Sequence, residues 1–509
     1  MYSASRVFLL FVPGLPQDLY EFAVWGTALL EGKNVYEEFP SSLQGILAIK
    51  YPALHFTFDA FVVALFGAAS LSFKVGILIV EVPSLLLLKR LHSILTRVGA
   101  ECLNPRVAKK EEGAMKIDAG KNITILEDEK NKELIVLYAY AFLPANLAAW
   151  INGHLFALAA LFLIAGLYAF FRGRSFLAGA ALSLGFLSEI YPVFALVPIL
   201  LYLLVRGEVG AFLRVICGFT LGFAACSLPF LVQDPTGYLN GFFVHLARLP
   251  KASSLWSFLS GSGIWGYLQV GPVSLSPLGV TFLVVLVGFS IATTVAFVKR
   301  NGGPRGEDVL AALSLFYILS PLVFLSLFPR YFFWGMPSYC LLLRGRVGSL
   351  VTLERTAVVL TATLFALFIS SLLAWPDAVL GDVRLLDPSQ IDPPRAGTYF
   401  YLMLFIIVAQ VIVVLPWVHA AEMIDIPGAP LRLTFVQVLV ACSALYVAMV
   451  FPLFFLGDEP LSSWLEGIKA VVVFFYAGTM DASCGRKLWN LLGTDAFSAD
   501  SSEEVLLVA

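Results

Sequence analysis

Charged side chains are scarce in this sequence. Asp, Glu, Lys and Arg make up 13% of its 509 residues, whereas 59% of the residues are hydrophobic. Soluble globular domains carry about 25% charged residues, so the composition excludes an ordinary soluble protein. The net charge of −2 provides no broad basic surface for nucleic acid. We therefore predict a membrane protein. Its expected partner is the lipid bilayer, and we expect it not to bind nucleic acid.

Cysteine is also sparse, and its placement argues against metal binding. The six cysteines show no CxxC pairing and fall at Cys102, Cys217, Cys226, Cys340, Cys442 and Cys484. Most of them lie inside apolar runs, where cysteine usually acts as a small buried hydrophobic residue. The pattern predicts neither a disulfide framework nor a zinc site.

Long apolar runs are what the sequence has in abundance. A helix needs about 20 mostly apolar residues to cross a bilayer. Runs that approach this length cover, approximately, residues 73–96, 134–150, 154–171, 175–188, 190–205, 211–232, 277–298, 309–328, 332–344, 356–375, 398–418, 433–456 and 464–480. With an N-terminal stub at Val7–Pro13 they predict an all-α, polytopic integral membrane protein with about 13–14 transmembrane helices.

The segment 52–70 decides the topology, because it is long enough to cross but begins at Pro52 and carries His55 and Asp59. If it stays in the interface, most of the 33 Lys and Arg residues share one side with the loop 97–133. The positive-inside rule then makes that side cytoplasmic and the loop 14–72 external. If it crosses, residues 14–51 join the basic side. The charge asymmetry favours the interpretation in which it does not cross.

Two of these loops have contrasting character. The outer loop contains a stretch with an apolar helical face, formed by Leu19, Phe22, Ala23, Leu29 and Leu30, which is typical of a helix that lies in the membrane plane. The loop 97–133 is rich in Lys and Glu, and we expect a solvated, disordered insert.

Short motifs then follow one another in a definite order. The outer loop contains Gln17-Asp18-Leu19-Tyr20, Trp25, Leu30-Glu31-Gly32-Lys33-Asn34-Val35-Tyr36 and Tyr51-Pro52-Ala53-Leu54. Further along come Leu143-Pro144-Ala145-Asn146, Asn152-Gly153-His154, Phe171-Arg172-Gly173-Arg174, Leu177-Ala178-Gly179 and Glu189-Ile190-Tyr191-Pro192. This order resembles the GT-C class of polyprenyl-phosphate-sugar glycosyltransferases, in particular the bacterial and archaeal mannosyltransferase-like members and the first GPI mannosyltransferase.

The resemblance covers roughly residues 14–250. Beyond this range it is weak and limited to Pro329-Arg330-Tyr331-Phe332 and Pro337. It departs from the family pattern at Glu189, where a lysine is frequent, and at His154, where a glutamine is frequent. Asp18 also lacks a second carboxylate two residues away. The resemblance implies a catalytic transmembrane module over 1–250, a variable transmembrane module over 251–480 and a cytoplasmic tail over 481–509.

The resemblance implies transfer of a hexose, most often mannose, from a polyprenyl or dolichyl phosphate to an acceptor hydroxyl on the outer or luminal face, with inversion. Such a reaction needs a general base, and Asp18 is the candidate; the alternative is that Asp18 only caps the helix that follows it. Arg330 is the first candidate for the phosphate, because an Arg fork matches phosphate oxygens. The remaining candidates for binding the donor are Arg248, His245, Tyr51, His154, Glu189 and Tyr191.

Ionisable residues inside spans are costly to bury, so each is a candidate for a functional role. Glu81 lies in the middle of its run and Glu189 at the outer end of its run; each either lines the cavity or pairs with a polar neighbour. His55 and Asp59 are four residues apart and share one face of a helix, which either points toward the cavity or caps a re-entrant turn.

Other functions stay open. A secondary transporter or a flippase of lipid-linked sugars would also have many spans and intramembrane acids, and a non-catalytic scaffold would not need Asp18. The acceptor is a glycan, a lipid or a protein. No metal site is predicted, although a divalent cation is compatible with the reaction. The expected location is the cell membrane, or the endoplasmic reticulum membrane in a eukaryote.

Overall fold

The computed structural model describes 14 stretches of chain and five isolated positions. The stretches are residues 1–12, 16–39, 51–103, 119–142, 146–147, 149–150, 156–243, 268–270, 273–275, 287–295, 297–298, 305–323, 334–342 and 380–385, and the isolated positions are 47, 49, 153, 361 and 365. Within these residues the fold is helical except for one antiparallel hairpin of β1 (Leu268–Val270) and β2 (Val273–Leu275), which pairs Leu268 with Leu275. The expected all-α class is therefore correct for the described chain apart from this hairpin.

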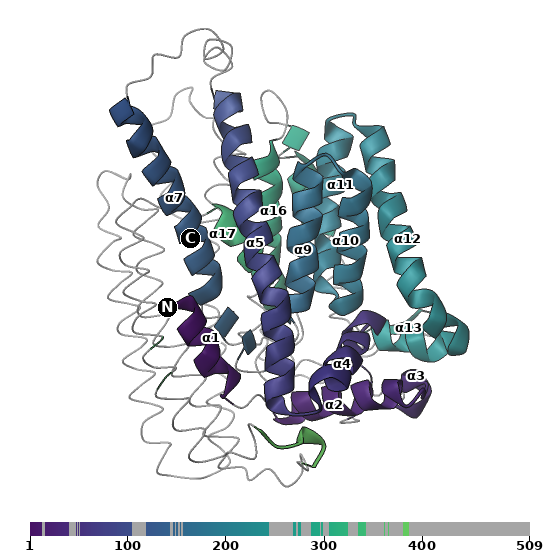
Figure 1. The fold of residues 1–509 in the computed structure, drawn as a ribbon. Helices are drawn as coiled ribbons and strands as arrows, with labels where there is room; N and C mark the ends of the chain where they lie inside the picture. The colour runs from purple at the N-terminus through teal and green to yellow at the C-terminus, as the bar shows by residue number, and fades with distance from the viewer. Residues whose placement is uncertain are drawn as a thin grey trace, which may run out of the picture.

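A bundle of roughly aligned helices forms the body of the molecule (Figure 1). Its members are α5 (Ser70–Leu103), α7 (Ala119–Phe142), α9 (Phe156–Phe171), α10 (Ser175–Ser188), η1 (Tyr191–Ala195), α11 (Leu196–Val205), α12 (Val209–Gln233), α16 (Gly306–Val323) and α17 (Met336–Leu342). The short α1 (Tyr2–Leu10) packs beside α5 and α7. Buried aliphatic and aromatic side chains fill the space between these helices.

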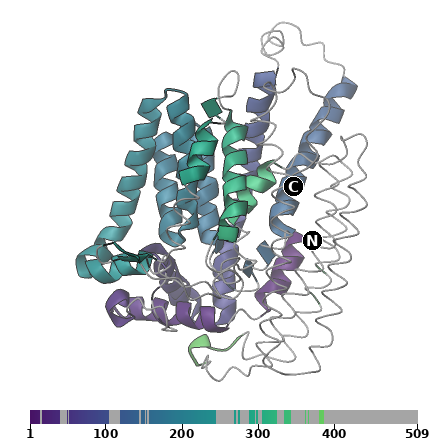
Figure 2. The same ribbon diagram turned by 180° about the vertical axis from the view of Figure 1, so that it is seen from behind.

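Short helices lie across one end of the bundle. These are α2 (Pro16–Leu30), α3 (Val35–Glu38), α4 (Ala53–Phe66) and α13 (Pro235–Phe243), with the 3₁₀ turn η3 (Val383–Leu385) against α2. Figure 2 shows the same arrangement from behind. A separate core joins them to the bundle, with Trp25, Phe56 and Tyr238 among its buried members. Helix α1 therefore ends, and α5 begins, at the same end of the bundle. Helix α4 lies at that end and does not run through the bundle.

The turns at the opposite end explain why the apolar runs fold back on themselves. Gly173 follows α9 with φ of 70°, and Gly207 follows α11 with the same φ. Glycine adopts this left-handed conformation without steric cost, so each helix ends there and α10 or α12 begins two residues later. Arg172 and Arg174 flank the first glycine, and Arg206 precedes the second.

Most predicted spans in the described chain correspond to helices, with differences at their ends. The run 175–188 matches α10, and 211–232 matches α12 within two residues. Within the run 134–150, α7 covers residues up to Phe142, and residues 143–145 and 148 lie outside the described chain. The predicted spans at 356–375, 398–418, 433–456 and 464–480 lie, almost wholly, outside the described residues. The count of 13–14 spans stays a prediction.

The disorder expected for the loop 97–133 is wrong in part. Residues 97–103 and 119–133 belong to helices α5 and α7, because a charged composition alone does not prevent a helix; residues 104–118 lie outside the described chain. Leu30, expected on the apolar face of α2, is 52% exposed. It is the last residue of α2, where the chain leaves α4, whereas Leu19, Phe22 and Ala23 are buried as predicted.

Two helices, Ser70–Thr96 within α5 and α12, are long and apolar enough to cross a membrane, and four shorter apolar helices accompany them in the described chain. The outward face of α12 carries apolar side chains that would be unfavourable in water, including Leu213 at 58% and Val232 at 73% exposure. Exposed apolar surface of this kind suits lipid. The structure and the composition together make this a membrane protein.

Candidate active site

Helix α2 is held against α4 by a contact between their backbones. At Gly26 a Cβ atom would lie 2.8 Å from the carbonyl carbon of Asp59 and 2.9 Å from the nitrogen of Ala60. Only glycine permits this approach without a shift of one helix. The contact fixes α2 across the end of the bundle.

A buried group of ionisable side chains lies beside this crossing. His55 and Asp59 come from α4, and Glu189 follows the last residue of α10. The Nε2 atom of His55 is 3.8 Å from Asp59 Oδ2, and its Nδ1 atom is 3.9 Å from Glu189 Oε1. His55 and Asp59 are fully buried, and Glu189 is 7% exposed. The predicted sharing of a helix face by His55 and Asp59 is thus confirmed, and the face points to the end of α10.

Aromatic rings enclose the imidazole of His55. Tyr51 stacks on it with ring centroids 4.2 Å apart and planes inclined by 13°. Phe22 of α2 lies 4.9 Å away from it, and Trp25, one turn further along α2, packs against Tyr51. Trp25 Nε1 donates to the carbonyl oxygen of Leu47 at 2.9 Å. The motif Tyr51-Pro52 therefore delivers a ring to the same site as α2.

The surroundings of His55 and Asp59 favour their uncharged forms. Burial lowers the pKa of His55 to about 3. Burial, with a smaller contribution from the charge of Glu189, raises the pKa of Asp59 well above its usual value. Desolvation penalises the charged form of either group, so the site favours a neutral imidazole and a neutral carboxyl group. Neither oxygen of Asp59 has a hydrogen-bond partner among the described residues.

Asp18 lies in the first turn of α2, where it is the third residue of the helix. It does not directly precede the helix, so the cap position assumed for the alternative interpretation is wrong; Pro16 opens the helix, as proline often does. A carboxylate in the first turn still interacts favourably with the helix dipole. Asp18 is half-buried, in contrast to the fully buried Asp59.

Leu19, the residue after Asp18, contacts a turn between α7 and α9. Gly153 has φ of 72°, and a Cβ atom there would lie 2.7 Å from Leu19 Cδ2. This turn belongs to the motif Asn152-Gly153-His154. The start of α2 thus lies against Gly153, in the second set of motifs that the sequence resemblance uses.

The remaining predicted site residues divide into three groups. Tyr51 and Glu189 meet at His55. Tyr191 lies in the helical core at 1% exposure, where its hydroxyl donates to the Phe156 carbonyl oxygen at 3.2 Å and its ring stacks on Trp334. These contacts give it a packing role. Four residues lie outside the described chain: Arg330, Arg248, His245 and His154.

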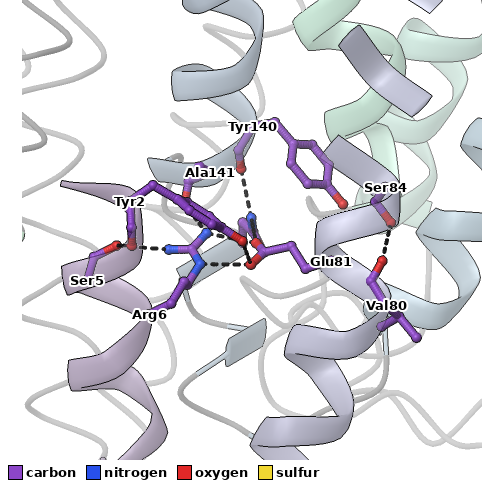
Figure 3. A network of polar contacts seen from close by, with 9 residues as sticks. Tyr2, Ser5, Arg6, Val80, Glu81, Ser84, Tyr140 and Ala141 are labelled. Carbon is purple, nitrogen blue, oxygen red and sulfur yellow. Dashed lines mark hydrogen bonds and ion pairs between the residues drawn. The ribbon is translucent and has the colours of Figure 1, made fainter. Parts of the chain in front are cut away.

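Glu81 belongs to a separate polar network, shown in Figure 3. Arg6 donates from Nε to Glu81 Oε2 at 2.8 Å and from Nη2 to Oε1 at 2.7 Å. The Tyr2 hydroxyl donates to Oε2 at 2.7 Å, and Asn146 Nδ2 donates to Oε1 at 3.0 Å. The interpretation that Glu81 pairs with polar neighbours is therefore confirmed. The network ties α1 to α5 and uses Asn146 of the motif Leu143-Pro144-Ala145-Asn146.

Comparison with known proteins finds similarity to solved structures only. No protein-family model matches the chain, and no curated protein is significantly similar to it. Among solved structures, ArnT from Cupriavidus metallidurans bound to undecaprenyl phosphate aligns with a TM-score of 0.41 and 14% identity, over 96% of this chain and 76% of that one. Its apo state aligns with a TM-score of 0.40 and 15% identity, over 97% and 76%. A likeness of this degree assigns no activity.

Sequence reasoning missed several buried charges. Glu21 of α2 is 3% exposed and follows Asp18 by three residues, which puts both carboxylates near one face of the helix. Lys74 is fully buried, and its Nζ donates to the carbonyl oxygens of Leu9 and Val12 at the end of α1. A charge in an otherwise apolar run was the available signal in each case. Arg6, at 1% exposure, and Lys74 are therefore buried inside the bundle and are not loop charges of the kind that the positive-inside rule counts.

Proposed function

We propose that this chain is a membrane glycosyltransferase that takes a sugar from a polyprenyl-phosphate donor and transfers it to an acceptor hydroxyl, with Asp18 as the general base. The observation that carries the proposal is the position of Asp18. It is a half-buried carboxylate in the first turn of a helix that crosses the end of the bundle. Asp59 and Glu81 are closed off by their neighbours, whereas Asp18 can meet an acceptor that arrives from outside.

The chemistry requires one base and a site for the leaving phosphate. The acceptor oxygen forms a bond to the anomeric carbon, its proton passes to the Asp18 carboxylate, and the bond from that carbon to the phosphate oxygen breaks. Polyprenyl phosphate leaves with the electron pair, and in-line attack inverts the anomeric centre. General-base assistance of this kind contributes about 10²–10⁴-fold to the rate.

The finer assignments follow the sequence resemblance. The donor sugar is a hexose, with mannose first, and the acceptor is a glycan, a lipid or a protein on the outer or luminal face. Arg330, and after it Arg248 with His245, are the candidates for the phosphate, because charge-assisted hydrogen bonds suit its oxygens. Tyr51 and Glu189 are candidates for the sugar, and His154 for the region beside Gly153.

The experiment that tests this function uses purified full-length protein in lipid nanodiscs. It is incubated with a panel of polyprenyl-phosphate sugars and candidate acceptors, and the release of polyprenyl phosphate is measured. We expect release with one donor, and it should depend on acceptor. Absence of release from every donor and acceptor pair would count against the proposal.

A proton-coupled transporter is the second candidate, favoured by the buried cluster of His55, Asp59 and Glu189. Ionisable groups held away from water are typical of proton and ion pathways in membranes. Proteoliposomes with an imposed pH gradient distinguish the two functions, because a transporter accumulates its solute without releasing polyprenyl phosphate.

A further inference from the structure

The hydrogen bond from His55 to α10 determines the tautomer of its ring. Nδ1 of His55 lies 3.1 Å from the carbonyl oxygen of Ser188. A carbonyl oxygen can only accept a hydrogen bond, so Nδ1 must carry the proton. In a neutral ring the other nitrogen, Nε2, then presents a lone pair.

The lone pair of Nε2 faces the carboxyl group of Asp59, at 3.8 Å from Oδ2. An ionised carboxylate would direct negative charge at this lone pair. A protonated carboxyl group removes this repulsion. Both side chains are fully buried, and burial favours the neutral acid. The substitution Asp59→Asn would likewise leave a neutral group of the same shape.

Other charged groups near this pair are few. From the end of α10, Glu189 Oε1 approaches His55 Nδ1 to 3.9 Å. The elements on the other sides contribute rings: Tyr51, Phe22 of α2, and Phe73 of α5, which packs on Phe22 at 6.2 Å. The described surroundings thus contain no Lys or Arg within ion-pair distance of Asp59 that would stabilise its anion.

Helix α2 lies directly on this pair. Phe22 contacts the His55 ring, and Gly26 contacts the backbone of Asp59. Asp18 precedes Phe22 by one helical turn. We therefore expect a change in the position of His55 or Asp59 to move the carboxylate of Asp18.

We propose that His55 and Asp59 form an uncharged positioning site. The His55 ring, hydrogen-bonded to the Ser188 carbonyl and packed against Phe22, and the Asp59 backbone in contact with Gly26 hold α2 on α4 and the end of α10, and so fix the Asp18 carboxylate relative to the acceptor. The effect on catalysis through Asp18 rests on the proposed glycosyltransferase function. The effect on the position of α2 does not rest on that function. His55 and Asp59 are positioning residues and take no proton from the acceptor.

The test measures the position of α2 and the activity in the same variants. Full-length protein without native cysteines carries spin labels at Leu30→Cys on α2 and Val232→Cys on α12, which are 52% and 73% exposed. Pulsed electron paramagnetic resonance gives the distance distribution between the labels in nanodiscs. Release of polyprenyl phosphate gives kcat and KM for the donor.

We expect Asp59→Asn to keep the narrow distance distribution and the kcat of the parent protein. His55→Ala should broaden the distribution and lower kcat by about 10²-fold, as small misplacements of a catalytic group do, with a smaller change in KM. His55→Asn retains a donor for the Ser188 carbonyl and should restore part of both. Leu65→Ala, a 58% exposed position on α4, is the matched control and should change neither.

Three results would overturn the proposal. A broadened distribution in Asp59→Asn would mean that a charged His55–Asp59 pair holds α2. A narrow distribution with lost kcat in Asp59→Asn would make Asp59 a proton carrier. An unchanged distribution in His55→Ala would remove the positioning role.

Two provisions keep the test decisive. If His55→Ala does not fold, Gly26→Ala replaces it: the added Cβ pushes α2 from Asp59 without altering a polar group, and it should shift the distance and lower kcat. If the parent protein releases no polyprenyl phosphate, the proposed function fails, while the distance distributions still decide whether the neutral pair holds α2.

Discussion

At the scale of single residues, burial separates carboxylates that look equivalent in the sequence. Glu81 has two hydrogen bonds from Arg6 and further ones from Tyr2 and Asn146, so it is fully occupied. Asp59 is as deeply buried but has no hydrogen-bond partner for either oxygen in the described chain. Asp18 is half-buried. Residue type and spacing predicted that each acid matters, but only the contacts separate a structural acid from a candidate base.

The role of Asp18 can be tested by replacing its charge. Asp18→Asn keeps the size of the side chain and loses the ability to take a proton at neutral pH. We expect a folded protein that binds the donor and transfers sugar about 10²–10⁴-fold more slowly. Loss of the favourable dipole interaction should cost only about 0.3–1 kcal/mol of stability.

Thermal unfolding and turnover must be measured on the same preparation of Asp18→Asn. Glu37→Gln is the control, since Glu37 is an exposed carboxylate at the same end of the molecule. Wild-type turnover in Asp18→Asn would remove Asp18 from the mechanism.

The pair of Arg6 and Glu81 should behave as a structural ion pair. Glu81→Gln leaves a buried Arg6 guanidinium without its counter-charge, and we expect a loss of about 3–5 kcal/mol in the free energy of unfolding. The double variant Arg6→Met with Glu81→Met should recover most of it, because no charge is left buried. A double-mutant cycle of unfolding in detergent measures the coupling.

Activity in the Arg6→Met, Glu81→Met protein tests the other interpretation of Glu81. If Glu81 lined the reaction cavity, this stable variant would be inactive. The rings of Tyr2, Phe142 and Trp150 lie 4.8, 5.8 and 5.3 Å from the Arg6 guanidinium carbon and would pack against Met.

At the scale of elements, small residues determine how closely the helices approach. A Cβ at Gly218 of α12 would overlap the Phe176 carbonyl oxygen of α10, and one at Gly179 would overlap the Val215 carbonyl oxygen. Gly218 and Gly222 form a GxxxG pattern, which lets helix backbones meet in membranes. The sequence contains this pattern, but the identity of the partner helix depends on the fold.

Gly218→Ala should therefore force α10 and α12 apart. Overpacking of this kind costs about 1–3 kcal/mol, and thermal unfolding in detergent should show the loss. The matched control is Gly210→Ala on the same helix, where the nearest atom to an added Cβ is the flexible end of Arg214 at 3.9 Å. Equal stability of both variants would contradict the packing seen between α10 and α12.

A contact from far along the chain also holds α2. Val383 donates from its backbone nitrogen to the Ala68 carbonyl oxygen at 2.9 Å, and its side chain is buried beside α2. Arg384 reaches the Thr27 hydroxyl at 3.3 Å. The second transmembrane module proposed for 251–480 thus helps to position the helix that carries Asp18, which no local pattern around Val383 indicated.

At the scale of the whole molecule, the directions of successive helices show which segments lie at each end of the helical bundle. Helix α5 begins beside α2 and α4, and α10 and α12 return to that end. The arginine-bearing turns after α9 and α11 lie at the other end with the start of α7. We expect the first end to be external or luminal and the second to be cytoplasmic.

Cysteines at exposed positions on the two ends test this orientation. In a cysteine-free background, Lys33→Cys and Lys130→Cys should react with an impermeant thiol reagent from opposite sides of sealed vesicles. Both positions are exposed. Labelling of both from one side would mean that α4 or another segment between them crosses, and the external location of Asp18 would fail with it.

The sequence by itself determined the membrane class, the helical content and most span positions in the described chain, because apolar runs must become helices to satisfy their backbone in lipid. It also identified Asp18, His55 and Asp59 as unusual charges. Their partners depend on tertiary structure: residues 133 and 75 positions apart, such as His55 with Ser188 and Arg6 with Glu81, meet only when helices pack. Burial and hydrogen bonding arise from that packing, so the protonation and the role of each acid were decided by the fold.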